Sequence, residues 1–518
     1  MNRLTLRFLI SLSCFVISII LFQFSTHEAT SSAQDLDNVT ISGRVADQNG
    51  AVLPGATVMA VRIATEAERT VVANAEGLYR FIELEPGAYT LRASFAGFAA
   101  EVKTNLTAVA GQHVRLDFTL RPADVVAEQV IINESLTPLV DTTRTVVGGT
   151  LTSAELESLP VQSREPLDLV FTLGGVTEEP LSTRDLAEDR DTNPRSTPEE
   201  AGTFSLSGGA AYSNNITIDG LDNNDDRAAR ERFQPSIEAV EEVQVITNQF
   251  SAEYGRASGG RINIRTRGGS GRYRGRLFYF YRNDIFNANT FRNNSLGLPK
   301  LPLEQRNPGF TLSGPVIIPK LFGLPGYRGS KRTFFFTAYE YDTVLDTSLV
   351  DTLVPVERSS LFPLPAPTTL NGRRLEDASA PSLAAEIAPY ISTISTPSRN
   401  HRLTVRLDHK FSDTHHGSFL YQLGRLTNLR QFGGGNRLAE ALLGRTRHTD
   451  ALAYSDHHVF SPKSVNQMRI QFSLLTPAIE ARGGASPVVL ISINDLLIAG
   501  DPFRRTGTLV AGTSTTES

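Results

Sequence analysis

The sequence has few of the residues on which many functional sites depend. Its 518 residues include no tryptophan, three methionines and a single cysteine, Cys14. Cys14 lies inside an apolar run near the N-terminus. We therefore expect the mature chain to hold no thiol, which excludes disulfides, zinc–thiolate sites and cysteine nucleophiles. The net charge of −5 is small for this length, and no basic stripe with interleaved aromatics occurs, so no nucleic-acid partner is implied.

Long apolar runs are missing everywhere except at the N-terminus. Two arginines at positions 3 and 7 precede the apolar segment 8–24, and small residues follow at 31–33. This order predicts a secretory signal peptide over residues 1–33, with a membrane anchor as the alternative reading. No later stretch is long and apolar enough for a transmembrane helix, so any later membrane crossing must use strands.

Motifs of hydrolases and nucleotide-binding enzymes are also missing. The sequence contains no His-x-x-Glu, His-Glu-x-x-His, Gly-x-Ser-x-Gly or Gly-Lys phosphate loop. The acidic run 219–226 lacks the order of an EF-hand, so a solvated loop is favoured over a calcium site. We expect a protein that is not an enzyme, with no catalytic residues, no metal site and no cofactor.

Residues 39–121 alternate between apolar and polar side chains with a period of two. Tyr89, Leu91, Ala93 and Phe95 are separated by polar residues, and turn signals such as Glu85-Pro86-Gly87 divide the runs. The pattern predicts a small antiparallel β-sandwich.

Three phrases of this sandwich resemble the carboxypeptidase regulatory-like domain, whose fold is described as carbohydrate-binding-like. They are Ile-Ser-Gly-Arg-Val at 41–45, Leu-Pro-Gly-Ala-Thr-Val at 53–58 and Gly-Leu-Tyr-Arg-Phe at 77–81. A starch-type site would need exposed aromatics, ideally tryptophan. We therefore expect Tyr79 and Phe81 to pack in the core.

Two segments further along carry the most information. Residues 216–222 read Ile-Thr-Ile-Asp-Gly-Leu-Asp, a strand that meets an Asp-Gly turn. Residues 251–269 read Ser-Ala-Glu-Tyr-Gly-Arg-Ala-Ser-Gly-Gly-Arg-Ile-Asn-Ile-Arg-Thr-Arg-Gly-Gly. Together they resemble the plug domain of TonB-dependent outer-membrane receptors, which implies a small α/β plug over residues 136–268. The residues that carry this plug motif are Asp219, Gly220, Tyr254, Gly255, Gly259, Gly260 and Asn263. We expect the three glycines after Tyr254 to supply permissive backbone.

In this family a short acidic-then-apolar strand, the TonB box, precedes the plug. TonB captures it by adding it as a strand to a periplasmic sheet, which requires little more than an extended backbone. A polar linker expected over residues 122–135 contains one candidate, formed by Glu128, Gln129, Val130, Ile131 and Ile132. The alternative reading is an edge strand of the sandwich or the first strand of the plug.

After residue 268 the sequence changes to aromatic strands. Between 402 and 411 apolar residues alternate with charged ones, and the same alternation returns between 467 and 474. Strands of this kind, with one apolar and one polar face, are typical of a transmembrane β-barrel. A soluble sandwich would also alternate, so the preceding plug decides the reading. The fold class is mainly β, with a β-sandwich, an α/β plug and the N-terminal part of an antiparallel barrel over 269–518.

The order of sandwich, plug and barrel, with Lys331–Phe336 and Tyr339-Glu340 early in the barrel, is similar to the Oar-like branch of the TonB-dependent receptors. The resemblance implies the outer membrane of a Gram-negative-type bacterium, with the sandwich in the periplasm. It also implies three partners: TonB with its inner-membrane energising complex, outer-membrane lipid, and an unknown large solute such as a carbohydrate or a peptide. The direction of transport stays open.

The barrel region is short for such a receptor. Plugged transporters use 22 strands, and the roughly 250 residues after the plug are too few for them. We therefore expect a truncated or split gene product. The leading hypothesis is an outer-membrane receptor. The alternative is a cell-surface adhesion or structural protein that uses the sandwich, and a zinc carboxypeptidase relative is disfavoured by the missing ligands.

Overall fold

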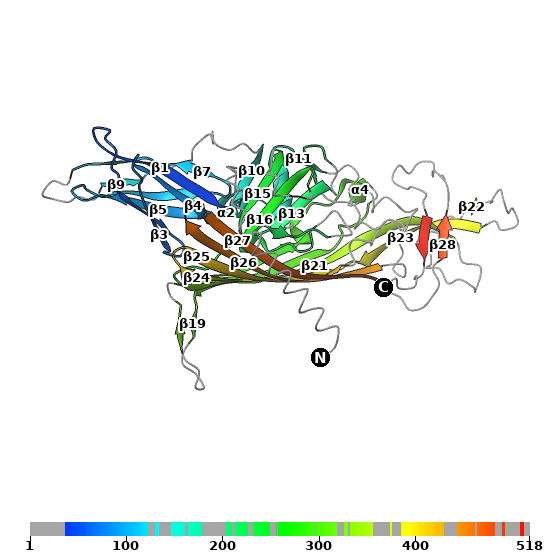
Figure 1. The fold of residues 1–518 in the computed structure, drawn as a ribbon. Helices are drawn as coiled ribbons and strands as arrows, with labels where there is room; N and C mark the ends of the chain where they lie inside the picture. Colours follow the sequence, from blue (N-terminus) through cyan, green and yellow to red (C-terminus); the bar gives the residue numbers. More distant parts are fainter. Residues whose placement is uncertain are drawn as a thin grey trace, which may run out of the picture. The chain divides into compact units, whose positions relative to one another are not determined.

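A computed structural model describes most of the chain (Figure 1). The described residues are 37–122, 130–133, 147–160, 164–178, 204–209, 213–225, 231–248, 255, 257–295, 297–318, 326–329, 332–355, 373–375, 385–428, 443–461, 464–481, 489–492 and 508–511. The expected signal peptide, residues 1–33, lies outside them. Among these residues, no helix has the length and apolar character needed to cross a membrane.

The N-terminal unit, residues 37–122 with strand β9, consists of two sheets. One has the order β4-β1-β7, with β8 also paired to β1, and the other has the order β3-β2-β5-β6-β9. The strands are β1 (Val39–Asp47), β2 (Thr57–Arg62), β3 (Glu68–Val72), β4 (Leu78–Leu84), β5 (Gly87–Ser94), β6 (Glu101–Ala108), β7 (His113–Arg115), β8 (Phe118–Leu120) and β9 (Val130–Asn133).

The core of this unit is built from the alternating apolar residues. Ile41 and Leu91 are fully buried in it. Tyr79 and Phe81 belong to the same core, and the Tyr79 hydroxyl donates to the carbonyl of Leu116 at 2.6 Å. The prediction that these two aromatics pack inside, and do not form an exposed sugar-binding face, is therefore confirmed.

The central unit, the described residues between 147 and 267, is a mixed sheet with short helices. Its five-stranded sheet has the order β10-β15-β16-β13-β14. The elements are β10 (Val147–Thr152), α2 (Ser153–Ser158), η1 (Pro166–Thr172), β11 (Val176–Glu178), β12 (Phe204–Leu206), β13 (Asn214–Ile218), β14 (Leu221–Asp222), η3 (Ile237–Ala239), β15 (Val240–Asn248) and β16 (Gly260–Thr266). Helix α2 begins with a capping box between Thr152 and Glu155.

The third part is a nine-stranded sheet, which we call the long sheet. Its main order is β17-β18-β21-β24-β25-β26-β27, with β23 paired to β21 and β22 to β23. Its strands are β17 (Arg274–Asn283), β18 (Leu303–Pro315), β21 (Thr333–Pro355), β22 (Arg373–Leu375), β23 (Ala385–Ser395), β24 (Ser398–Ser412), β25 (His415–Asn428), β26 (Leu443–Ser461) and β27 (Ser464–Ala481).

Short elements complete the described part of this region. They are η4 (Asp284–Phe286), α4 (Phe291–Ser295), β19 (Ile317–Ile318), β20 (Tyr327–Arg328), β28 (Val489–Ser492) and β29 (Thr508–Ala511). All neighbouring strands of the long sheet pair antiparallel, and a two-residue loop joins β24 to β25, where Ser412 pairs with His415. This mainly β architecture agrees with the predicted fold class.

Candidate functional site: the central unit on the polar face of the long sheet

The long sheet has its apolar side chains on the outside. Leu277 is 86% exposed and Phe472 is 70% exposed. Other large apolar residues that are exposed on these strands are Tyr279, Tyr281, Phe310, Leu312, Leu407, Phe419, Leu452, Met468, Ile470 and Leu474. Such a surface is unfavourable in water and favourable against hydrocarbon.

The opposite face of the same strands is polar and buried. On β24, Arg402, Thr404 and Arg406 are buried. Buried polar residues on the other strands of this sheet include Asn307, Glu340, Gln422, Arg445, Arg447, Thr449 and Ser455. An apolar outer face with a polar inner face is the pattern of transmembrane barrel strands.

Stacked aromatic and histidine side chains lie at both ends of the apolar face. Toward the hairpin turns, Phe411 stacks on His415 at 4.6 Å, and His415 stacks on His458 at 4.6 Å. Toward the other end of β24, Tyr341 stacks on His401 at 4.4 Å. From His401 to His409 is eight residue steps along β24, or roughly 27 Å along the strand at about 3.4 Å per residue. That span is close to the height of an outer-membrane apolar band, about 25 Å before tilt is considered.

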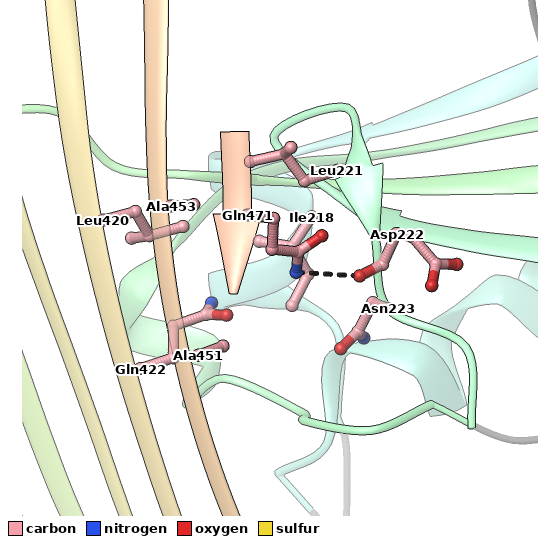
Figure 2. A pocket seen from close by; sticks show the side chains of 9 residues that line it. All are labelled: Ile218, Leu221, Asp222, Asn223, Leu420, Gln422, Ala451, Ala453 and Gln471. Atoms are coloured by element: carbon pink, nitrogen blue, oxygen red, sulfur yellow. Dashed lines mark hydrogen bonds between the residues drawn. The ribbon is translucent and has the colours of Figure 1, made fainter. Parts of the chain in front are cut away.

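The central unit covers the polar face. Leu420 of β25 and Ala453 of β26 join the hydrophobic core of the central unit, beside Ile218. Figure 2 shows the contact, in which the β13–β14 hairpin of the central unit faces β25, β26 and β27 across a small polar gap. There the side-chain amide of Gln471 donates to the carbonyl of Asp222 at 2.9 Å.

A set of mostly buried charges also joins the two parts. Glu340 of β21 is fully buried and accepts from the guanidinium of Arg164 at 3.4 Å and from the hydroxyl of Ser236. Arg164 also pairs with Glu238 at 3.1 Å, and Arg276 of β17 pairs with Glu238 at 2.7 Å. Because Arg164 is the ion-pair partner of Glu340, removal of Arg164 leaves Glu340 buried without an ion-pair partner.

Arg164 also explains an irregularity in strand β17. From the sequence, Phe278 and Phe280 break the polar side of this strand. In the structure the Arg164 guanidinium lies 3.7 Å from the centroid of the Phe280 ring and 5.4 Å from that of Phe278. Both rings therefore make cation–π contacts with a charged side chain of the central unit. Sequence reasoning did not identify Arg164, but the single charge Glu340 within the aromatic run of β21 was a usable signal.

The predicted plug-motif residues Asp219, Gly220 and Asn263 come together. Asp219 and Gly220 have φ values of 49° and 76°, as a type I′ hairpin turn between β13 and β14 requires. The Asn263 side-chain oxygen accepts from the backbone of Gly220 at 3.1 Å and from Thr217 at 2.8 Å. Asp219 accepts from the backbone of Thr266 at 2.9 Å. The motif thus fixes the hairpin that faces the long sheet.

The permissive backbone that we expected of the motif's glycines does not explain why they are glycines. Gly255, Gly259 and Gly260 do not have positive φ, so conformational freedom does not explain them. A Cβ at Gly260 would lie 2.7 Å from the carbonyl oxygen of Ile246, and one at Gly259 would lie 2.6 Å from the side-chain oxygen of Asn214. Close packing therefore explains these two, whereas a Cβ at Gly255 would meet nothing within 4 Å. Tyr254 lies outside the described residues.

Acidic residues connect the N-terminal unit to the rest. The buried carboxylate of Asp37 pairs with Arg261 of β16 at 2.9 Å and with Arg469 of β27 at 3.0 Å. Burial alone would raise the pKa of Asp37, but Arg261 and Arg469 hold it below its ordinary value. Glu85 behaves in the same way, because Arg62 and then Arg406 outweigh burial and lower its pKa.

The TonB-box candidate lies partly outside the described residues, which include neither Glu128 nor Gln129. Val130, Ile131 and Ile132 belong to β9, which pairs parallel with β6. The acidic run after Asp219 contributes ion pairs: Asp222 pairs with Arg232, and Asp225 pairs with Arg447 at 3.3 Å. Among the residues that the structure describes, no cluster of three His, Cys, Asp or Glu could hold a metal.

Comparison with known proteins matches two regions. Residues 40–121 match the carboxypeptidase regulatory-like domain, and residues 265–495 match an outer membrane beta barrel domain. The chain is also 28% identical over 329 residues to the TonB-dependent transporter Oar of Myxococcus xanthus. The chain is thus similar to an Oar transporter of the TonB-dependent class. The match covers 62% of this chain and 29% of the relative, so the chain spans less than a third of that protein.

Solved structures of the receptor class are also similar. The outer membrane transporter YddB from Escherichia coli has a TM-score of 0.43 and 11% identity, over 70% of this chain and 42% of that one. The siderophore receptor PirA from Pseudomonas aeruginosa has a TM-score of 0.38 and 14% identity, over 65% and 41%.

The barrel-domain match and the Oar-like relative place this chain in the outer membrane. The relative matched by sequence is a transporter and not an enzyme. Both conclusions agree with the expectations from the sequence.

Proposed function

We propose that this chain forms part of a TonB-dependent outer-membrane transporter, in which the central unit is the plug. One observation carries the proposal: the long sheet exposes its apolar face and covers its polar face with the central unit. A soluble sheet would bury its apolar side instead. In a barrel wall the exposed face meets lipid and the polar face lines a lumen.

The contacts of the central unit suit a stopper that can be released. Two small apolar contacts, around Leu420 with Ala453 and between Ala239 and β21, stand among many hydrogen bonds and ion pairs. Polar contacts exchange readily with water, whereas a large apolar interface would hold the plug permanently. No cofactor enters this scheme. Energy for release would come from TonB and its inner-membrane complex, acting on Glu128–Ile132, and the cargo would be a large solute.

We further infer that the working wall contains more strands than those of the long sheet. In the described part of the chain, β17 and β27 end the strand order, and each pairs with a neighbour on one side. Backbone groups exposed to hydrocarbon are strongly unfavourable, so the functional barrel needs strands to close between these edges. This supports the expectation that the chain works as part of a longer protein.

The proposal is tested by binding of the periplasmic domain of TonB to the purified chain in detergent. We expect saturable binding that is lost when residues 128–132 are deleted. A deletion of five residues at 138–142, between β9 and β10, serves as the matched control and should leave binding intact. Equal binding by both deletion variants, or no binding by the parent chain, would contradict the proposal.

A further inference from the structure

A row of imidazole and phenyl rings crosses the outer face of the long sheet at one end, from β24 through β25 to β26. The distances between successive ring centroids are 4.5 Å from His409 to Phe411, 4.6 Å from Phe411 to His415, 4.6 Å from His415 to His458 and 4.1 Å from His458 to Phe460. We call these five residues the ring row. Phe411 and Phe460 are exposed, so the row lies at the surface of the sheet.

The end of the sheet that carries the ring row has short connections. Two residues join β24 to β25, and Ser461 of β26 pairs with Ser464 of β27. In outer-membrane barrels the short turns face the periplasm. The N-terminal unit reaches the same end, where the side chain of Lys410 donates to the carbonyl of Glu68 at 3.4 Å. The ring row therefore lies where the apolar band meets the headgroups of the periplasmic leaflet.

The ring row differs from the usual aromatic border of a membrane protein in its polar groups. Tryptophan and tyrosine usually place a ring N–H or O–H at this level, but this chain has no tryptophan. Imidazole can supply the N–H groups instead. His415 Nε2 lies 2.8 Å from a carboxylate oxygen of Asp456, which also accepts from the hydroxyl of Tyr454 at 3.0 Å. The His458 ring stacks on His415 and, within the described part of the chain, has no hydrogen-bond or ion-pair partner.

The charges around the ring row favour an anion. Arg332 is exposed directly before β21, and its carbonyl accepts from the backbone of Lys410 at 2.7 Å. Arg328 of β20 is exposed as well. Of the acidic groups, Asp413 pairs with Lys410 at 2.7 Å, and the carboxylate of Asp456 is occupied as described above. The two exposed guanidinium groups therefore leave a positive charge beside the imidazoles.

We propose that the ring row is a binding surface for the phosphate groups of phospholipids in the periplasmic leaflet, with the His458 imidazole as the principal donor. The proposal rests on the membrane wall proposed above. Hydrogen bonds to a phosphate are strengthened by its charge, and the phenyl rings on either side pack against the adjoining acyl chains. The row thereby fixes the height of the long sheet in the membrane, because any shift along the membrane normal would separate the imidazoles from the phosphates.

Retention of lipid by the purified full chain in detergent, measured by native mass spectrometry, tests this surface. The two probes are phosphatidylglycerol and a diacylglycerol with the same acyl chains, offered at equal concentration, so that only the phosphate-containing headgroup differs. The variant His458→Phe keeps the stacked ring and removes its N–H. The matched control is His448→Phe, which changes an exposed histidine near the other end of β26.

We expect the parent chain and His448→Phe to retain phosphatidylglycerol over diacylglycerol by roughly fivefold. His458→Phe should lose most of this preference and retain diacylglycerol as the parent chain does. Equal retention of the two lipids by the parent chain, an unchanged preference in His458→Phe, or the same loss in both variants would overturn this inference alone. If the parent chain retains neither lipid, the proposed membrane wall fails with it.

Discussion

The N-terminal unit and the long sheet are both made of alternating strands, yet their polarity is opposite. In the N-terminal unit, Ile41 and Leu91 are fully buried. In the long sheet, Leu277 is 86% exposed, while Glu340 is fully buried. The same alternation with a period of two therefore occurs in a unit surrounded by water and in a sheet whose outer face meets lipid. One unit keeps its apolar residues from water, and the other presents them to lipid.

The difference teaches that alternation gives the strand and its two faces but not the medium that each face meets. The medium follows from what packs against the polar side. In the N-terminal unit the apolar faces of the two sheets pack into one core, whereas the central unit occupies the polar face of the long sheet with ion pairs and hydrogen bonds. The identity of the covering unit is thus the deciding observation.

The largest effect is expected from a substitution that disrupts the polar interior of the long sheet. Arg164→Ala leaves the fully buried Glu340 without its ion-pair partner and should cost about 3–5 kcal/mol in the free energy that holds the central unit in place. The matched control is Arg306→Ala on β18, which removes the half-exposed partner of Glu304 and should leave the unfolding midpoint close to that of the parent chain. Urea unfolding in detergent, followed by limited proteolysis of the central unit, compares the two. Equal midpoints would show that the polar face is not an interior.

The next effect tests the apolar exterior. Phe419→Arg places a charge on the outer face of β25 and should cost about 2–4 kcal/mol in lipid. Leu78→Arg, at a half-exposed site of the N-terminal unit, should change stability by less than about 0.5 kcal/mol. The fraction of protein that folds into lipid vesicles is the measurement. If both variants fold as well as the parent chain, the outer face does not contact hydrocarbon.

Acid should weaken the junction between the two regions. The pKa values of Asp37 and Glu85 are lowered in the folded protein, so their contribution is complete above the ordinary carboxyl pKa, about 4, and is lost as the pH falls below it. Asp37→Asn should flatten the loss of stability between about pH 5 and pH 3, removing roughly 1.5–3 kcal/mol at neutral pH. Urea midpoints against pH measure this. An unchanged profile for Asp37→Asn would refute the account.

The smallest effect concerns the packing of the central unit. Gly260→Ala drives a methyl group against the carbonyl of Ile246 and the side chain of Leu206, which should cost about 1–3 kcal/mol. Gly255→Ala meets open space and should lie within about 0.5 kcal/mol of the parent. Thermal unfolding of the two variants side by side checks the difference. Similar losses for both would mean that the glycines are required for some other reason.

Local chemistry explains what could be predicted from the sequence. The Asp219–Gly220 turn, the Thr152 cap and the alternation of β24 depend on neighbours along the chain, and all three are present. The charges that join the parts could not be predicted, because Arg164 and Glu340 are 176 residues apart and Asp37 and Arg261 are 224 apart. Sequence spacing carries no signal for such pairs.

The absence of tryptophan from the chain provides the most direct test of the central claim, that the exposed apolar face of the long sheet lies in lipid. Phe419→Trp introduces a single fluorophore on that face, and Leu78→Trp introduces one on the N-terminal unit. In vesicles of lipids brominated on their acyl chains, fluorescence at position 419 should be quenched by the lipid and protected from aqueous iodide, with the reverse at position 78. Quenching of the position-419 probe by iodide alone would contradict a membrane wall.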